Sequence, residues 1–231
     1  MKKIKIKKNS KKVIIFGITG QDGSYLCDLL LKKNYKVYGI TRDKKNNNLD
    51  NLRRLKIINK VIIYTIKDIT KKKIFNLIKK ISPSQIYYLA GQSSVGESFR
   101  DPITTYKSNN IALFYILEGI RKFNKNISLY NSASSECFGN NNKIFCDEKT
   151  VLSPVSPYGK SKSFGLWLTS YYREIFGIKV SSAILFNHES PLRKNKFVSQ
   201  KIINYAKNYK IGSKKLILGD TNIYRDWGWA N

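Results

Sequence analysis

Residues 155–164 read VSPYGKSKSF and contain a tyrosine, Tyr158, with a lysine, Lys162, four positions later. On a helix, positions i and i+4 lie on one face, so the phenol and the amine would be neighbours. A lysine there can lower the pKa of the phenol and make it a proton donor and acceptor near neutral pH. Tyrosine and lysine are both frequent in this chain, so the surroundings of the pair must decide whether it is catalytic.

A second chemical signal is a glycine-rich turn, FGITGQDG, in which Gly17, Gly20 and Gly23 recur at every third residue. Glycine permits a tight turn and lets the backbone approach a diphosphate, and the N-terminus of the following helix supplies N–H donors. The turn stands after the first predicted strand, which favours dinucleotide binding over a purely structural turn. The predicted contacts in this turn are Gly17, Ile18, Thr19, Gly20, Gln21, Asp22 and Gly23.

The type of dinucleotide depends on the end of the second predicted strand, where Arg42 and Asp43 stand next to each other. An arginine there accommodates the 2′-phosphate of NADP, whereas a carboxylate bonds the 2′-hydroxyl of NAD. Arg42 therefore favours NADP, and Asp43 keeps NAD possible. Further predicted cofactor contacts follow the third and fourth strands: Asp68, Ile69, Leu89, Ala90, Gly91, Gln92 and Ser93.

The elements that must position these residues alternate regularly along the chain. Apolar runs predict strands at 11–16, 36–42, 61–68, 85–91, 127–135 and 179–186. Helical spacing predicts helices over 22–34, 71–82, 104–122 and 156–176, with Asn34 capping the first and Pro83 stopping the second. This alternation predicts an α/β fold, a Rossmann-like doubly wound parallel sheet. The polar stretch 43–54 is predicted to be a surface loop with one helical turn at most.

The net charge of +28 has two readings. One is a nucleic-acid or anionic-membrane partner. The other is a lysine-rich composition spread along the whole chain, mostly on predicted solvent faces and outside any nucleic-acid-binding motif. The even spread favours the second reading, so neither a specific nucleic-acid partner nor a membrane partner is expected. Residues 1–12 are the exception and are predicted to form a mobile basic tail.

The few cysteines and histidines limit metal and redox chemistry. Cys27, Cys137 and Cys146 are odd in number and show no C-x-x-C spacing, which indicates reduced thiols in a cytoplasmic compartment. The single histidine, His188, argues against a metal site. The apolar run after the basic start is too short and too broken by glycine for a membrane segment or a signal peptide.

Six stretches then occur in order: FGITGQDGSYL, YYLAGQSSVGESF, NSASSECFG, SPYGKSK, ILFNHESPLR and RDWGWA. Together they resemble the GDP-mannose 4,6-dehydratase family, within the extended short-chain dehydrogenases/reductases, from about residue 13 to the last residue. The resemblance implies that Tyr158 takes the proton of the substrate's C4 hydroxyl. Lys162 would hold the nicotinamide ribose and keep the phenol acidic, and Ser134 would hydrogen-bond the reacting oxygen. Glu136 would remove the C5 proton as water leaves from C6.

The family's reaction is an internal redox cycle on GDP-α-D-mannose that yields GDP-4-dehydro-6-deoxy-D-mannose. By resemblance, bound NADP takes hydride from C4 and returns it to C6. The resemblance also places His188 and Arg193 beside the cofactor, and implies a homodimer or homotetramer. The positions that it assigns to the sugar nucleotide are Ser94, Asn187, Lys201 and Arg225.

The resemblance implies a division into a cofactor-binding domain, 13–185, and the beginning of a smaller substrate domain, 186–231. Family members continue beyond the point that corresponds to residue 231, so an incomplete substrate domain is expected. The chain would then be a fragment, a protein completed by another chain, or one that has lost its activity. Three other readings stay open: another sugar-nucleotide epimerase or reductase, a non-catalytic dinucleotide-binding remnant, and a basic nucleic-acid binder. Glu136 beside Ser134 argues against the first of these.

Overall fold

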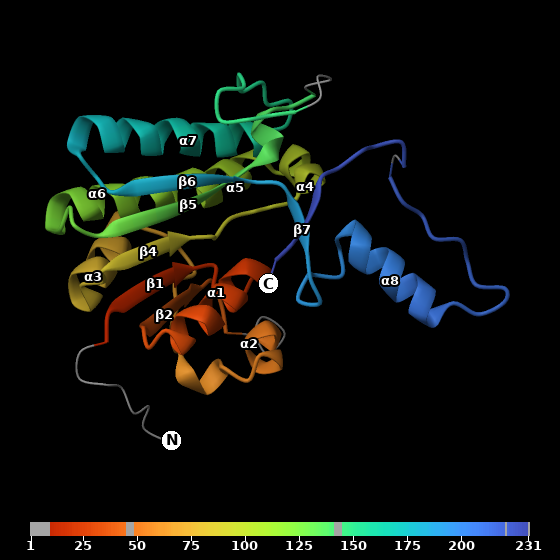
Figure 1. Ribbon diagram of the computed structural model, residues 1–231, viewed down its shortest axis with the longest axis horizontal. Helices are drawn as coiled ribbons and strands as arrows, with labels where there is room; N and C mark the ends of the chain where they lie inside the picture. Colours follow the sequence, from red (N-terminus) through yellow and green to blue (C-terminus); the bar gives the residue numbers. More distant parts are fainter. Residues whose placement is uncertain (1–9, 45–48, 141–144, 220, 231) are drawn as a thin grey trace.

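A computed structural model of the chain describes residues 10–44, 49–140, 145–219 and 221–230. Its centre is a six-stranded parallel sheet with strand order β3-β2-β1-β4-β5-β6 (Figure 1). The strands are β1 (Lys12–Phe16), β2 (Lys36–Thr41), β3 (Ile62–Thr65), β4 (Gln85–Tyr88), β5 (Ser128–Ser134) and β6 (Val180–Leu185). All five strand pairs are parallel, and the order reverses direction between β1 and β4. The predicted Rossmann-like doubly wound sheet is confirmed.

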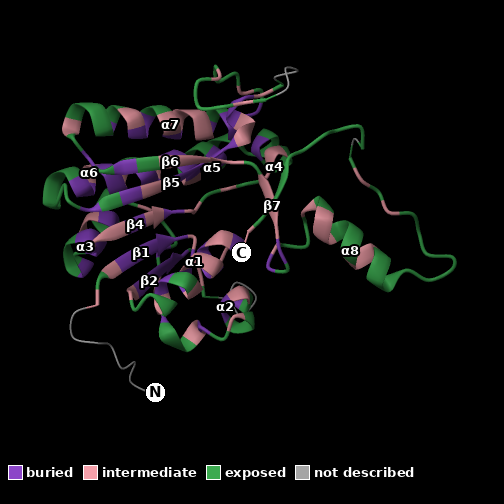
Figure 2. Cartoon of the chain, viewed as in Figure 1, coloured by how far each residue is buried: buried purple, intermediate pink, exposed green. Residues whose placement is uncertain are grey.

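Helices cover both faces of this sheet because the strands are apolar on both sides. In β1, Val13 and Ile15 pack into one core and Ile14 and Phe16 into the other. The first core lies under α1 (Gln21–Lys32) and α2 (Asp50–Arg54). The second lies under α3 (Lys71–Ile81), α6 (Ala112–Phe123) and α7 (Pro157–Phe176). Buried residues accordingly gather in the sheet and on the inner faces of these helices (Figure 2).

The predicted helices form with small differences at their ends. The helix α1 ends at Lys32, and Asn34 adopts a left-handed φ of 62° just beyond it, where asparagine is tolerated. Pro83 follows the left-handed Ser82 that ends α3. The stretch 43–54 contains α2 as its one short helix, and residues 45–48 within it lie outside the described residues. Residues 1–9 of the predicted basic tail lie outside the described residues. The predicted end of the tail at residue 12 is wrong, because Lys12 begins β1 and pairs with β2.

One predicted helix, 104–122, is divided by a wider turn. It comprises α5 (Pro102–Tyr106), a π-turn η3 (Lys107–Ile111) and α6. The π-turn inserts an extra residue into the helical repeat, so residues on either side face different neighbours than a regular helix would give them. This shift turns Asn109 and Asn110 into the protein interior, where both are buried.

Several short elements have no counterpart in the prediction. They are η2 (Ile58–Lys60), α4 (Val95–Arg100), η4 (Ser135–Cys137), β7 (Asn187–Glu189), α8 (Val198–Asn208) and β8 (Trp227–Trp229). The strands β7 and β8 pair with each other in a separate two-stranded parallel sheet. The helix α8 projects away from the six-stranded sheet (Figure 1). After Leu192, no residue that the structure describes is buried.

Candidate active site

The glycine-rich turn connects β1 to the N-terminus of α1. The Gly17 N–H donates to the carbonyl of Ile40 in β2 at 3.1 Å, and the Gly20 N–H donates back to the Gly17 carbonyl at 3.0 Å. A Cβ added at Gly23 would lie 2.3 Å from the Gly17 carbonyl oxygen, so only glycine fits where the helix crosses the turn. Gly20 caps α1 without any side-chain hydrogen bond, so no side chain occupies the first N–H groups. This donor set fits a diphosphate.

The segment after β6 lies against the glycine-rich turn, although the residues in contact are 166 or more positions apart in the sequence. The Gln21 amide donates to the His188 carbonyl at 3.1 Å, and the Ser190 hydroxyl donates to Gln21 Oε1 at 2.7 Å. His188 Nε2 lies 2.9 Å from Asp22 Oδ1, and its Nδ1 lies 2.7 Å from the Phe186 carbonyl. These contacts join the two sequence stretches that were predicted to face the cofactor.

The ring of His188 and the carboxylate of Asp22 stabilise each other's charged forms. The hydrogen bond to Asp22 raises the pKa of His188 above its ordinary value, and burial opposes this effect. Burial raises the pKa of Asp22, but the hydrogen bond and the charge of His188 outweigh burial and lower it overall. Asp22 is therefore engaged as an anion next to the glycine-rich turn.

The helix α2 also ties the returning segment to the turn. The Asn51 amide donates to the carbonyls of Thr19 at 3.3 Å and of Leu192 at 3.2 Å. The Arg54 guanidinium donates to the Pro191 carbonyl at 2.8 Å. Asn51 was not predicted because it lies in a predicted loop. Ser190 lies in the stretch ILFNHESPLR, but the resemblance gave it no role.

Ser134, Glu136, Tyr158 and Lys162 come from the carboxyl end of β5 and from the start of α7. Ser134 ends β5, and Glu136 follows within the short helix η4. Tyr158 is the second residue of α7, and Lys162 stands one turn further along it. The Lys162 amine donates to the carbonyl of Ser132 in β5 at 2.8 Å and lies 5.8 Å from the centre of the Tyr158 ring. The predicted one-face arrangement of Tyr158 and Lys162 is present.

The ionisation of this pair differs from the prediction. Burial raises the pKa of Tyr158 to about 12, and the hydrogen bond with Ser134 offsets burial only in part. Burial also lowers the pKa of Lys162 to about 8. The prediction that the lysine lowers the pKa of the phenol is wrong for the described chain, because desolvation of the phenol dominates and the amine is directed to Ser132. The hydrogen bond with Ser134 and, to a smaller extent, the charge of Arg193 favour ionisation of the phenol.

The start of α7 is held tightly against η4. The Ser156 hydroxyl caps the helix by accepting from the Gly159 N–H at 3.0 Å, and Pro157 stands at the first helical position. A Cβ at Gly159 would lie 2.5 Å from the Glu136 carbonyl oxygen, so glycine is needed for this approach. The main chain of Glu136 therefore contacts the helix turn that carries Tyr158, and the Glu136 side chain is half-buried.

The loop after β4, residues 89–94, is joined to α7 by a residue that the sequence analysis missed. Asn109 is only 3% exposed, and its amide donates to the Gln92 carbonyl at 3.3 Å and to the Ser161 hydroxyl at 2.8 Å. Ser161 immediately precedes Lys162. Asn109 thus connects the predicted cofactor loop to the catalytic helix, and the π-turn that directs it inward gave no signal in the sequence.

In the part of the chain that the structure describes, five other predicted residues form no hydrogen bond with the four catalytic candidates. Arg42 is exposed beyond the end of β2, and Asp68 is exposed beyond β3 with its carbonyl accepting from Lys73 Nζ at 3.0 Å. Ser94 caps α4, where its hydroxyl accepts from the Glu97 N–H at 3.3 Å. Lys201 on α8 and Arg225 before β8 are both exposed. The structure brings neither of these two cations into a hydrogen bond with the four catalytic candidates.

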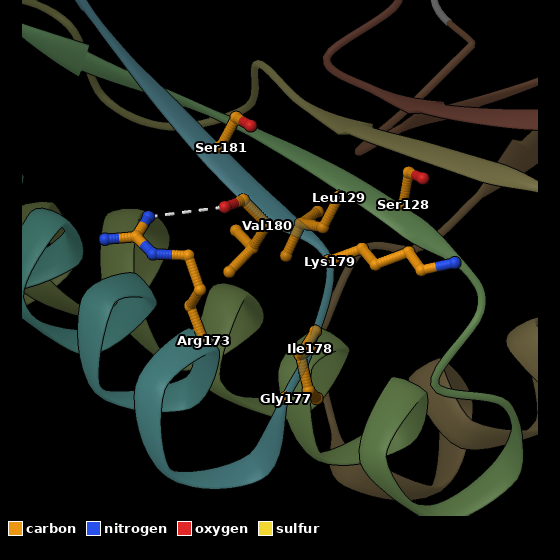
Figure 3. Close-up of a pocket in the computed structure, with 8 residues that line it drawn as sticks. All are labelled: Ser128, Leu129, Arg173, Gly177, Ile178, Lys179, Val180 and Ser181. Atoms are coloured by element: carbon orange, nitrogen blue, oxygen red, sulfur yellow. Dashed lines mark hydrogen bonds between the residues drawn. The ribbon is translucent and has the colours of Figure 1, made fainter.

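Two cavities differ in their place on the sheet. One of about 640 Å³ is lined by Asp22, Leu89, Asn187 and His188, among others, and so gathers predicted residues from three separate segments. The other, of about 390 Å³, lies at the amino ends of β5 and β6, where Arg173 donates to the Val180 carbonyl at 3.4 Å (Figure 3). Ligands of doubly wound sheets bind at the carboxyl ends of the strands. The first cavity borders the candidate site through Asp22 and His188, although none of the four catalytic candidates lines it, and the second lies at the opposite end of the strands.

Neither a metal-binding cluster nor a membrane-spanning helix is present within the ranges that the structure covers. No cluster of histidine, cysteine and acidic residues there could hold a metal ion. No helix there is long and apolar enough to cross a membrane. All three cysteines are free thiols, and Cys27 and Cys137 are buried.

Comparisons with known proteins agree with the geometry. A family model described as GDP-mannose 4,6 dehydratase matches residues 14–231. A GDP-mannose 4,6-dehydratase of Sordaria araneosa is 38% identical over 224 residues, which cover 95% of this chain and 41% of that protein. A GDP-mannose 4,6-dehydratase of Vibrio cholerae is 37% identical over 235 residues, which cover 96% of this chain and 62% of that protein. The chain therefore spans less than two thirds of the length of these curated relatives.

A solved structure supports the fold. UDP-glucuronic acid 4-epimerase from Bacillus cereus, in complex with UDP-glucuronic acid and NAD, superposes with a TM-score of 0.80 at 23% identity. The alignment covers 95% of this chain and 69% of the epimerase. At this level of identity the likeness concerns the fold alone.

Proposed function

The chain belongs to the GDP-mannose 4,6-dehydratase family, and from this premise we propose that it carries the dinucleotide site and the catalytic residues of such a dehydratase. The proposed reaction converts GDP-α-D-mannose to GDP-4-dehydro-6-deoxy-α-D-mannose with loss of water. The observation that supports the proposal is that Ser134 and Glu136 stand at the carboxyl end of β5, where the start of α7 brings Tyr158 and Lys162 to them.

The proposed roles follow from what each side chain can do. Tyr158 accepts the proton of the C4 hydroxyl, and its hydrogen bond with Ser134 stabilises the phenolate that this transfer needs. Lys162 contributes a cation beside the phenol, held by the Ser132 carbonyl. Glu136 removes the proton at C5, which a neighbouring C4 ketone makes acidic, as the C6 hydroxyl departs. A simple alcohol dehydrogenase has no use for such an acid at this position.

The cofactor is proposed to be NADP, with NAD as the alternative. When bound, the nicotinamide supplies a reversible hydride acceptor, so that the oxidation at C4 and the reduction at C6 leave no net change. The uncapped start of α1 and the clamped segment 186–193 would hold its diphosphate region. Arg42 at the end of β2 supports the choice of NADP, and Asp43 beside it keeps NAD possible.

Three further proposals concern the setting of the site. The division between a cofactor domain, 13–185, and a substrate domain, 186–231, is supported by the change of sheet between β6 and β7. A homo-oligomer is supported by an uncharged stripe on α7: Phe164, Trp167, Tyr171 and Ile175 recur at helical spacing, and the last three are exposed. A cytoplasmic location is supported by the free thiols.

The proposed function is tested by incubating the purified chain with NADP+ and GDP-mannose and following the sugar nucleotide by mass spectrometry. The expected product has lost one water, with no net change in the nicotinamide absorbance. Tyr158→Phe and Glu136→Gln should each abolish it. Tyr209→Phe and Glu148→Gln make the same chemical changes at exposed positions outside the site and should retain activity.

A second candidate is a dinucleotide-binding protein without dehydratase activity. It is favoured by one observation: the described residues after Leu192 include Lys201 and Arg225, and none of them is buried. Under this reading the chain binds the dinucleotide, releases no water from GDP-mannose, and is unaffected in binding by Glu136→Gln. The same mass-spectrometric experiment, accompanied by a binding titration, separates the two candidates.

A further inference from the structure

The solvent side of α3 carries lysines and no acidic residue. Lysines occupy positions 71–73, 79 and 80 of this helix, and all five are exposed. Three of them stand in the first turn, where the helix dipole disfavours cations, so their placement does not serve the stability of the helix. The opposite side of the helix is buried in the core through Ile74, Leu77, Ile78 and Ile81. Packing of that side therefore directs the lysines into solvent.

Toward β3, the lysines of α3 adjoin a pair of tyrosine rings. The rings of Tyr38 and Tyr64 stack with their centres 6.3 Å apart. Lys80 lies 5.8 Å from the centre of the Tyr64 ring, and Lys36 lies 5.6 Å from the centre of the Tyr38 ring. Tyr64 is half-buried and belongs to β3, which stands at the end of the strand order. A continuous row of contacts thus joins α3 to β2 and β3.

Toward α6, α3 adjoins a second pair of rings. Phe75 and Phe123 meet edge to face with their centres 5.3 Å apart, where α3 and the end of α6 lie side by side (Figure 1). Lys71 and Lys122 lie 5.4 Å and 5.9 Å from the centre of the Phe75 ring. Phe123 is 37% exposed. We call the solvent side of α3 together with the two ring pairs, Tyr38–Tyr64 and Phe75–Phe123, the α3 surface.

Two carboxylates border the α3 surface without neutralising it. Glu118 on α6 is paired with Arg121 at 2.8 Å and accepts from the Tyr172 hydroxyl at 2.7 Å. Asp68 is exposed before α3, and its carbonyl accepts from Lys73 Nζ at 3.0 Å. None of the five lysines of α3 forms an ion pair with a carboxylate in the described parts of the chain. The α3 surface therefore keeps an excess of positive charge.

Cations that alternate with aromatic rings suit a flexible polyanion that carries flat groups. In a single-stranded nucleic acid the phosphates meet the lysines and the bases stack on the rings. An anionic membrane fits less well, because insertion needs large apolar side chains on the exposed face, where α3 presents lysines and Asn76. A duplex keeps the faces of its bases stacked on one another, so it would leave the rings unused.

We propose that the α3 surface binds single-stranded nucleic acid without sequence preference. It shares no residue with the glycine-rich turn or with the four catalytic candidates, so this is a further property beside the proposed dehydratase. The lack of a nucleic-acid-binding motif agrees with recognition by charge and stacking alone. The even spread of lysine along the sequence did not predict the α3 surface, because its two ring pairs form only when α3 packs beside β3 and α6.

The test is a fluorescence-anisotropy titration of the full chain with a labelled oligothymidylate of about 16 nucleotides, near the upper site size of single-strand-binding folds. The titration is repeated at several salt concentrations. A triple variant with Lys72→Gln, Lys79→Gln and Lys80→Gln removes three of the cations. Because each phosphate contact in a single strand contributes about 0.7 to the slope of log affinity against log salt, the slope should become shallower by about 2.

A matched triple variant with Lys207→Gln, Lys214→Gln and Lys215→Gln removes the same charge from exposed positions elsewhere and should keep the slope of the wild type. Phe123→Leu removes a ring and no charge. Its affinity should fall about fivefold or more at an unchanged slope, as expected for the loss of one stacked base. Thermal melts check the fold of each variant. If the first triple variant does not fold, Lys79→Gln alone should make the slope shallower by about 0.7.

Several outcomes would overturn the inference. They are an unchanged slope after the α3 substitutions, an equal change of slope in both triple variants, unchanged affinity in Phe123→Leu, and equal affinity for a duplex of the same length. Binding to vesicles of phosphatidylserine and phosphatidylcholine, with no binding to the oligothymidylate, would identify a membrane surface instead. A shallower slope confined to the α3 variant, together with weaker binding by Phe123→Leu, would support the inference.

Discussion

Two regions of the chain are stabilised in different ways: residues 13–192 and residues 193–230. The first region holds both hydrophobic cores, with side chains such as Ile14 and Ile116 fully buried. In the second, the described residues are exposed or half-buried, and α8 lies apart from the sheet (Figure 2). The second region is attached by the short β7–β8 pairing and by hydrogen bonds around Ser190. A packed core stabilises the first region, and a few polar contacts position the second.

This difference divides the site as well. The glycine-rich turn and the four catalytic candidates all belong to the first region, as do the contacts of His188 and Ser190 with Gln21 and Asp22. Lys201 and Arg225, predicted to bind the sugar nucleotide, belong to the second. Cofactor binding should therefore be the more robust property, and substrate binding should depend on how the second region is held.

The largest expected effect comes from the core of the first region. Ile14 is fully buried between β2 and β4, so Ile14→Ala removes contacts on all sides and leaves a cavity. The free energy of unfolding should fall by about 2–5 kcal/mol. Urea unfolding followed by circular dichroism measures this loss. A loss below that of an exposed substitution would contradict the assignment of Ile14 to the core.

Asn109→Ala should have the next largest effect, because it removes the tie between the loop after β4 and α7. Loss of these buried hydrogen bonds should cost about 1–3 kcal/mol of unfolding free energy. Dinucleotide affinity should fall as well, since Gln92 and Ser161 are no longer joined. Ser161→Ala removes one of the two contacts and serves as the matched comparison. Unchanged affinity in Asn109→Ala would show that this tie does not position the site.

His188→Gln should produce a smaller and pH-dependent effect. The raised pKa of His188 means that its contribution is present below its ordinary pKa of 6.5 and is lost as pH rises through the folded value. The lowered pKa of Asp22 means that its contribution is present above 3.8 and is lost as pH falls further. The difference in stability between wild type and variant should therefore be greatest between pH 3.8 and 6.5.

The size of this difference is limited by solvent. The Asp22 side chain is 37% exposed and that of His188 23%, so screening reduces the contribution to about 0.5–1 kcal/mol. Urea unfolding curves of the wild type and of His188→Gln are compared at pH 5.5 and at pH 8.5, below and above the ordinary pKa of histidine. A stability difference that is equal at both pH values would contradict an ionised Asp22–His188 pair.

The smallest effect is expected in the second region. Ile202→Ala makes the same chemical change on α8 as Ile14→Ala makes in the core. Because Ile202 is 45% exposed, the substitution removes little buried apolar surface. Its effect on unfolding free energy should stay within about 0.5 kcal/mol. A loss comparable to that of Ile14→Ala would show that α8 is packed against another surface in solution.

The sequence predicted the first region far better than the second. Each strand of the six-stranded sheet is a short apolar run, and apolar runs that alternate with helical spacing are a local signal. The pairing of β7 with β8 depends on Asn187 and Trp227, which are far apart in sequence and exposed or half-buried, so no local pattern marks it. The helix α8 does carry helical spacing, at Val198, Ile202 and Tyr205, and that signal was overlooked.

The candidate site was predicted in its residue types but not in its physical state. The neighbourhood of Tyr158 and Lys162 follows from their i, i+4 spacing. The raised pKa of Tyr158 does not, because it depends on burial that a motif cannot reveal. Likewise, the contacts of Asn109 depend on a π-turn, and those of Asn51 depend on a returning segment; both are products of tertiary packing.

The most direct test of the central claim uses GDP-mannose that carries deuterium at C4, with unlabelled NADP+ and the wild-type chain. The expected product has lost one water and has kept the deuterium, now at C6, because the hydride removed at C4 is returned within the same molecule. A chain that binds the dinucleotide and forms no dehydrated product, or a product that has lost the deuterium, would contradict the claim that these residues perform an internal redox dehydration.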